Sequence, residues 1–64
     1  MKVKEFKKTE KFRNADIIKY YESDGTETEF SNIELNNKKF DNKEIIGEAC
    51  SNKCGLIIVE LVLE

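Results

Sequence analysis

The sequence contains no histidine, no tryptophan and no proline, and it has one arginine compared with ten lysines. Histidine is the usual general base near neutral pH and the commonest metal ligand, so two frequent kinds of site lose their main residue. The sequence also has no nucleophile elbow and no glycine loop of the type that binds phosphate. We therefore predict that the protein is not an enzyme and that it holds no cofactor.

Long apolar runs are also missing. No stretch reaches the length of a membrane span, and residues 1–14 lack the apolar segment of a signal peptide, so we expect a cytoplasmic protein without membrane contact. The 64 residues predict a single small domain, 1–64. A chain of this length buries only about 60% of the surface that its unfolded form exposes, and such domains often depend on association.

The segment 56–63 is the most apolar part of the chain and has the composition of a β-strand. Side chains of a strand alternate between its two faces. One face is wholly apolar, with Ile57, Val59, Leu61 and Leu63, and should join a core with Ile18, Tyr20 and Phe30. The other carries Leu56, Ile58 and Val62, interrupted by Glu60, and a chain this short can hardly cover it. We therefore predict association through that face, either as a homo-oligomer or with another protein.

The pair Asp24-Gly25 between two β-prone segments predicts a β-hairpin. A two-residue turn would place Glu22 opposite Glu27, which is unfavourable. A three-residue loop, 23–25, with Gly25 in the left-handed conformation gives better partners. Its pairs are Lys19 with Glu29, Ile18 with Phe30, and Tyr20 with Thr28.

Residues 42–52 fit two structures. The capping-box pattern at 41–44 and the apolar spacing after it allow a short helix, whereas Gly47 disfavours a helix interior. We favour a strand at 44–50 that turns through 51–53 and sets Ile45 opposite Val59 and Ile46 opposite Ile58. With a short edge strand at 3–8, the predicted fold is mainly β, a small antiparallel sheet of four to five strands in two hairpins. The alternative is an α+β fold with one short helix at about 42–52.

Cys50 and Cys54 are the only residues with evident chemical potential, and in the predicted hairpin they face each other across the turn. We expect two reduced, packed thiols, because thiols in the cytosol stay reduced. A cross-turn disulfide is the second interpretation. Zinc would use Cys50 and Cys54 but needs further ligands from another chain or from carboxylates, and a redox site does not match the spacing.

Charge is unevenly distributed. Residues 1–13 carry six basic and two acidic side chains, whereas the stretch from Glu22 to Glu34 carries five acids and no base. An acidic stretch can imitate the phosphates of nucleic acid or simply form a solvated face. With the exposed aromatic expected from the Tyr20-Tyr21 pair, the predicted interface comprises Leu56, Ile58, Val62, Tyr21, Glu22, Asp24, Glu27 and Glu29. The N-terminal bases lack a recognition motif, so nucleic acid is not the partner we expect.

The pattern of residues 40–46, a turn, and then 55–61 resembles the end of small β-rich proteins encoded by phages and mobile elements of low-GC Gram-positive bacteria. The resemblance implies the cytoplasm of a host cell and the possibility of inhibiting a host defence protein. We therefore predict a non-enzymatic protein-binding module that docks on a host protein or acts as a homodimer. The alternatives are a nucleic-acid-associated accessory protein that uses the basic N-terminus, and a small thiol-metal structural module.

Overall fold

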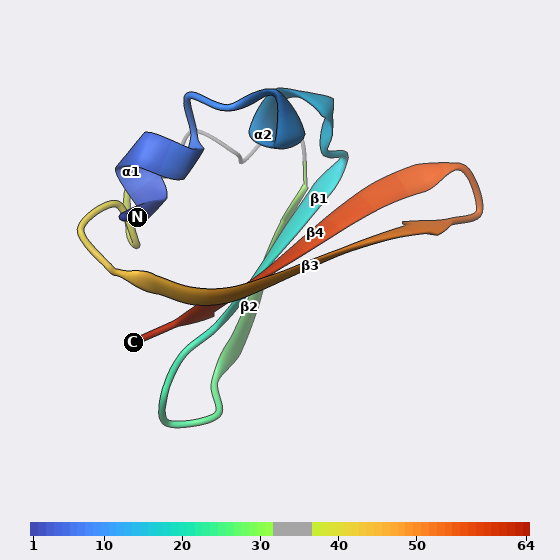
Figure 1. The fold of residues 1–64 in the computed structure, drawn as a ribbon. Coiled ribbons are helices and arrows are strands. Elements are labelled where there is room, and N and C mark those ends of the chain that lie inside the picture. Colours follow the sequence, from blue (N-terminus) through green and yellow to red (C-terminus); the bar gives the residue numbers. More distant parts are fainter. Residues whose placement is uncertain (32–36) are drawn as a thin grey trace.

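A computed structural model describes residues 1–31 and 37–64 of the chain. Two short helices, α1 (Val3–Phe6) and α2 (Glu10–Asn14), precede a four-stranded sheet. The strands are β1 (Ile17–Tyr21), β2 (Glu27–Ser31), β3 (Ile45–Lys53) and β4 (Leu56–Leu63), in the spatial order β2-β1-β4-β3. Both helices lie on one side of the sheet, and the β3–β4 hairpin projects beyond them (Figure 1).

The sheet consists of two hairpins placed side by side. β1 and β2 are antiparallel, as are β3 and β4, whereas β1 and β4, in the middle, are parallel. The predicted mainly β fold with four strands in two hairpins is confirmed, while the central pairing makes the sheet mixed rather than antiparallel throughout. The reason is that the connection from β2 leads to β3 at the opposite edge, which leaves the apolar strand β4 in the centre.

The first hairpin has the predicted register. Lys19 pairs with Glu29, Ile18 with Phe30 and Tyr20 with Thr28. Gly25 has a φ of 93°, in the left-handed region, and its N–H donates to the carbonyl of Glu22 over 2.9 Å. The three-residue loop is therefore confirmed, together with the left-handed conformation on which it depends.

The second hairpin is a strand pair, but its predicted register is wrong. Ile45 pairs with Leu63 rather than Val59, and Cys50 pairs with Val59. The chain reverses at Cys54-Gly55, where both residues have positive φ, 53° and 81°. A two-residue turn with this backbone matches the twist of the flanking strands, and it lets β4 pair along its length. A bulge between Ile45 and Gly47 absorbs the remaining mismatch.

Short helices do accompany the sheet, but they lie at the N-terminus, and residues 45–53 form a strand instead of the alternative helix. The prediction of an edge strand at 3–8 is wrong, because residues 3–6 form α1. Val3 and Phe6 are three residues apart, so a helical turn brings both onto one face, where they are buried. Thr9 caps α2 by accepting the N–H of Phe12. None of the helices in the described residues is long and apolar enough to cross a membrane.

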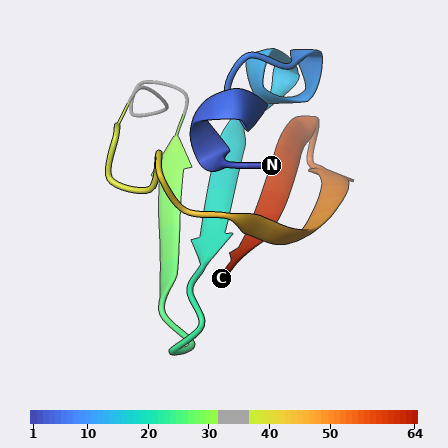
Figure 2. The ribbon, with the colours of Figure 1, turned by 60° about the vertical axis from the view of Figure 1, so that its left-hand side comes forward.

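The core lies on the helical side of the sheet. Below 10% of the surface of each core side chain is exposed, and the set is Val3, Phe6, Phe12, Ala15, Ile18, Tyr20, Phe30, Phe40, Val59, Leu61 and Leu63. Phe40 comes from the connection before β3 and packs on Tyr20, with ring centroids 4.7 Å apart. Residues 37–44 of that connection cross the same side of the sheet as the helices (Figure 2). The predicted core face is therefore confirmed for Ile18, Tyr20 and Phe30 with Val59, Leu61 and Leu63, whereas Ile57, which was predicted to share this face, is only half-buried.

Asp16 fixes the start of the parallel pair. Its backbone N–H donates to the carbonyl of Ile57 over 2.8 Å, and its carboxylate accepts the N–H of Ile57, also over 2.8 Å. The side chain thus continues the hydrogen bonding of the two central strands by one step beyond β1. This double contact selects the register in which Ile17 lies beside Ile58.

The loop of the first hairpin gives a direct test. Gly25→Ala should destabilise the protein by about 1 kcal/mol, because a β-carbon is unfavourable at this φ although no atom within 4 Å would touch it. Gly47→Ala is the matched control: its φ is ordinary and its new β-carbon would lie 3.6 Å from that of Val62, in normal contact. Urea denaturation measures both changes. Equal midpoints for the two variants would contradict the strained-loop explanation.

Removal of the Asp16 carboxylate tests the link between the hairpins. Asp16→Ala leaves the half-buried N–H of Ile57 without its acceptor, so we expect a loss of about 1–3 kcal/mol in the free energy of unfolding. Asp16→Asn keeps an oxygen at the same place and should lose clearly less. If urea midpoints show Asn and Ala to be equally destabilising, this hydrogen bond does not fix the register.

Candidate functional site on the open face of the sheet

The side of the sheet that faces away from the helices is not covered by any described part of the chain. We call it the open face, and the pairing registers place on it Ile17, Lys19, Tyr21, Glu27, Glu29, Ser31, Gly47, Ala49, Ser51, Lys53, Leu56, Ile58, Glu60 and Val62. None of these residues is buried, whereas every buried residue of the four strands lies on the opposite side. The open face is therefore the largest feature that the core does not explain.

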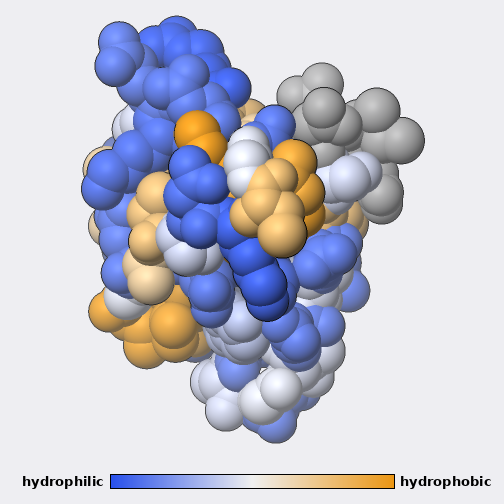
Figure 3. All heavy atoms as spheres, turned by 90° about the vertical axis from the view of Figure 1, so that its right-hand side faces the viewer, coloured by the Kyte–Doolittle hydropathy of each residue, from blue (hydrophilic) through white to orange (hydrophobic). Residues whose placement is uncertain are grey.

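Aliphatic side chains occupy the middle of the open face. Ile17 of β1 lies beside Ile58 of β4, with Leu56 and Val62 at either end of the same strand. Leu56 is 43% exposed and Val62 is 41% exposed, and with Ile17 and Ile58 between them they form an apolar row rather than single exposed residues. In the space-filling view from the hairpin end, hydrophobic atoms reach the surface in several patches below a hydrophilic cap (Figure 3).

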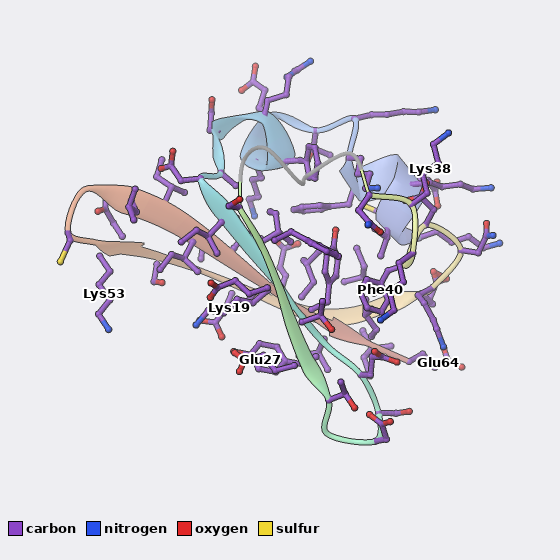
Figure 4. All side chains as sticks on the ribbon, turned by 180° about the vertical axis from the view of Figure 1, so that it is seen from behind. Lys19, Glu27, Lys38, Phe40, Lys53 and Glu64 are labelled. Carbon is purple, nitrogen blue, oxygen red and sulfur yellow. The ribbon has the colours of Figure 1, made fainter. Side chains whose placement is uncertain are left out.

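Carboxylates gather on the half of the open face formed by β1 and β2. The Lys19 ammonium lies 3.7 Å from a carboxylate oxygen of Glu27 and 3.9 Å from one of Glu29. The lysine side chain is 27% exposed, but the glutamate side chains are 49% and 57% exposed, so the acids form the outer layer. Figure 4 shows Lys19 and Glu27 on one side of the sheet and Phe40 on the other.

Tyr21 connects the acidic and apolar halves. Its hydroxyl donates to a carboxylate oxygen of Glu60 over 2.9 Å. Hydrogen bonding to Glu60 and then to Glu27 raises the pKa of the Tyr21 phenol well above its usual range, because its ionised form would face two negative charges. Tyr21 thus works as a neutral hydrogen-bond donor that orients Glu60 beside the exposed Val62.

Six of the eight residues predicted for the interface come together on the open face: Leu56, Ile58, Val62, Tyr21, Glu27 and Glu29. Glu22 and Asp24 belong instead to the loop of the first hairpin. Asp24 accepts the N–H of Thr26 over 2.9 Å, and contacts with Thr26 lower the pKa of its carboxyl, so this acid stabilises the turn. Glu34 lies outside the described residues.

The predicted interface omits Ile17, Lys19 and Glu60, although alternation in the strand 56–63 had already placed Glu60 on the same face as Ile58 and Val62. Alternation in β1 and the predicted Lys19–Glu29 pair already put Lys19 on the face opposite the core. The parallel contact of β1 with β4 was not predicted, and this contact brings Ile17 beside Ile58 and Lys19 beside Glu60. Sequence periodicity identifies the faces of single strands but does not identify their neighbours.

The two cysteines do not form the predicted arrangement. Cys50 lies within β3 opposite Val59, Cys54 lies in the turn, and both thiols are free and exposed rather than packed. The difference follows from the shifted register of the second hairpin. The described residues contain no group of three or more His, Cys, Asp or Glu side chains that could hold a metal ion.

The basic N-terminal residues lie on the helical side, away from the open face. Lys7 donates to Asp41 and to the carbonyl of Asn37, and Lys11 donates to Glu48 over 2.9 Å. These contacts tie the helices to the connection and to β3. Two of the lysines in this region therefore have structural partners.

No family model, no curated protein and no solved structure matches this chain. The open face is therefore the feature of the described structure that bears on function. Its distinctive features are the exposed aliphatic centre, the outer carboxylates and the hydrogen bond from Tyr21 to Glu60.

Alkaline titration tests the environments of the tyrosines. Burial, and then the charge of Asp41, raises the pKa of Tyr20 to about 12, and the pKa of Tyr21 is raised further by its carboxylate neighbours. Because the unfolded chain ionises near pH 10 and the folded chain does not, stability should fall as the pH rises from about 10 to 12. Ultraviolet difference spectra of the native protein and of Tyr21→Phe follow both groups. A phenol that ionises near pH 10 in the folded protein would contradict this arrangement.

Proposed function

We propose that this chain is a non-enzymatic protein-binding module that acts through the open face of its sheet. The observation that carries the proposal is the row of aliphatic side chains left accessible on β4, flanked by Ile17 of β1. The folded chain leaves a large part of the Leu56 and Val62 side chains in contact with water. A docked protein would bury both of them.

The free energy that a partner would gain by burying the aliphatic row can be estimated from the side chains in it. Full burial of one such side chain contributes about 1.5–3 kcal/mol, and the part of it that is already buried within the chain has contributed some of this. The binding free energy can therefore include several kcal/mol from Leu56, Ile58 and Val62 together. The entropic cost of association offsets part of this. The aliphatic row alone supports weak binding, and specific binding needs the polar groups around it as well.

A more specific form of the proposal is an inhibitor from a phage or mobile element that docks on a host defence protein in the host cytoplasm. Its support is the resemblance of the pattern in residues 40–61 and the acidic half of the open face. An inhibitor of this kind needs no catalytic group, because occupation of a surface on the target is sufficient.

Nucleic-acid binding through the N-terminus has weaker support. Four basic side chains of this region are exposed and have no ion-pair partner in the described structure: Lys2, Lys4, Lys8 and Arg13. However, Glu5 and Glu10 lie among them in the sequence, and the negative charges of the open face would repel a polyanion. The thiol-metal alternative also has little support, because Cys54 lies in the turn and Cys50 lies within β3 opposite Val59, not opposite Cys54. Neither alternative explains the exposed aliphatic row.

The test uses lysine substitutions on the two sides of the sheet. Ile58→Lys and Val62→Lys should keep the free energy of unfolding within about 1 kcal/mol, because neither side chain is core. Leu61→Ala, one residue from Val62 but on the buried side, should lose about 2–5 kcal/mol. Urea denaturation measures all three variants.

The same variants test binding by affinity capture from a lysate of a low-GC Gram-positive bacterium. Ile58→Lys and Val62→Lys should lose the proteins that the wild type retains. Asn42→Lys, which adds the same charge at an exposed position before β3, should retain them. Capture that is equal for all four proteins would show that the open face is not the binding surface.

A further inference from the structure

We infer that the open face is built for a positively charged protein surface with an apolar centre, and not for a second copy of this chain packed face to face. This inference rests on the proposed function and adds the chemistry of the partner. The number and position of the charges around the aliphatic row favour such a partner.

Carboxylates outnumber cations on the part of the open face formed by β1, β2 and β4. Glu27, Glu29 and Glu60 surround Lys19, which is the only cation on β1, β2 or β4 on this side. Its ammonium is shared between Glu27 and Glu29 at 3.7 and 3.9 Å. One ammonium cannot neutralise three carboxylates, so this half of the face keeps a negative potential that attracts a basic partner.

The position of Glu60 indicates where a cation of the partner would have to lie. It lies on the central strand, beside Lys19 and between Ile58 and Val62 along the open side of β4. Its described polar contact is the hydrogen bond from Tyr21. Any protein that covers the aliphatic row also removes water from this carboxylate, and a buried carboxylate needs a cation close to it. A lysine or arginine from the partner meets that need.

A second copy packed face to face would bring its own carboxylates to the same place. The open face carries three carboxylates and two ammonium groups, and the second ammonium, that of Lys53, lies at the distant tip of the β3–β4 hairpin (Figure 4). Two such faces would together bury an excess of negative charge. The carboxylates thus disfavour self-association of an apolar surface while they favour a basic partner.

Short synthetic peptides provide defined probes. One alternates lysine with leucine, a second alternates glutamate with leucine, and a third alternates lysine with serine. Titration of the isotope-labelled full chain, followed by amide chemical shifts at moderate salt, reports both the affinity and the face that is contacted. We expect the lysine-leucine peptide to shift amides of β1 and β4, and the other two to bind at least about tenfold more weakly.

The decisive variant is the double substitution Glu27→Gln and Glu29→Gln. It should weaken binding of the lysine-leucine peptide about tenfold and, at the same time, increase self-association in sedimentation equilibrium, because it removes charge that keeps two copies apart. The matched control neutralises Glu10 and Glu48, two exposed acids on the helical side of the sheet. It should leave both measurements unchanged.

The alternative outcomes separate the inference from the proposed function. Equal binding by wild type and the double variant, with loss in Val62→Lys, would keep the open face and overturn the basic partner. A wild-type dimer that Val62→Lys dissociates would identify a second copy as the occupant and overturn the inference. Salt-sensitive oligomers lost in the double variant would mean docking of the basic helical side of one copy on the open face of the next, which also overturns it.

Discussion

The parallel pairing of β1 with β4 divides the side chains of this protein into a core and an exposed surface. In its register Ile18 lies beside Val59 and Tyr20 beside Leu61, and these four are buried. The alternate pairs bring the aliphatic residues of β1 and β4, and Lys19 with Glu60, onto the open face. A slip of one residue would exchange the faces of one strand, burying charges and exposing apolar groups. The two contacts of Asp16 with Ile57 oppose that slip at its start.

Every described segment outside the sheet and its hairpin turns packs on the same face of it. Two helices of four and five residues, together with the connection that carries Phe40, complete the core on one side. No other described segment remains for the opposite side, and the N-terminal residues that could have covered it are used in the core. The aliphatic row is thus exposed because the described helices and the connection all pack on the opposite side of the sheet, and its acidic border is the feature on which we base the proposed partner.

The sequence predicts the features of this fold that depend on neighbours along the chain. Gly25 and the charge pairing of Lys19 with Glu29 were sufficient for the first hairpin, and alternation in β4 was sufficient for its buried face. The second hairpin was displaced because a turn with positive φ at a cysteine has no sequence signal comparable to Asp-Gly. The parallel contact could not be predicted, since it depends on where the connection before β3 leads. With that contact missing, Lys19 and Glu60 could not be placed together.

β4 combines both properties in one strand. Its odd-numbered residues from Val59 to Leu63 stabilise the monomer, and its even-numbered ones carry the surface that we propose for binding. Because the two sets alternate, they can change independently: a substitution at Val62 alters the surface while Leu61 and Leu63 keep the fold. Glu60 is the one charged residue in this strand, and Tyr21 holds it by a hydrogen bond. A side chain that only kept the strand soluble would not need a defined orientation, whereas one that receives a cation from a partner does.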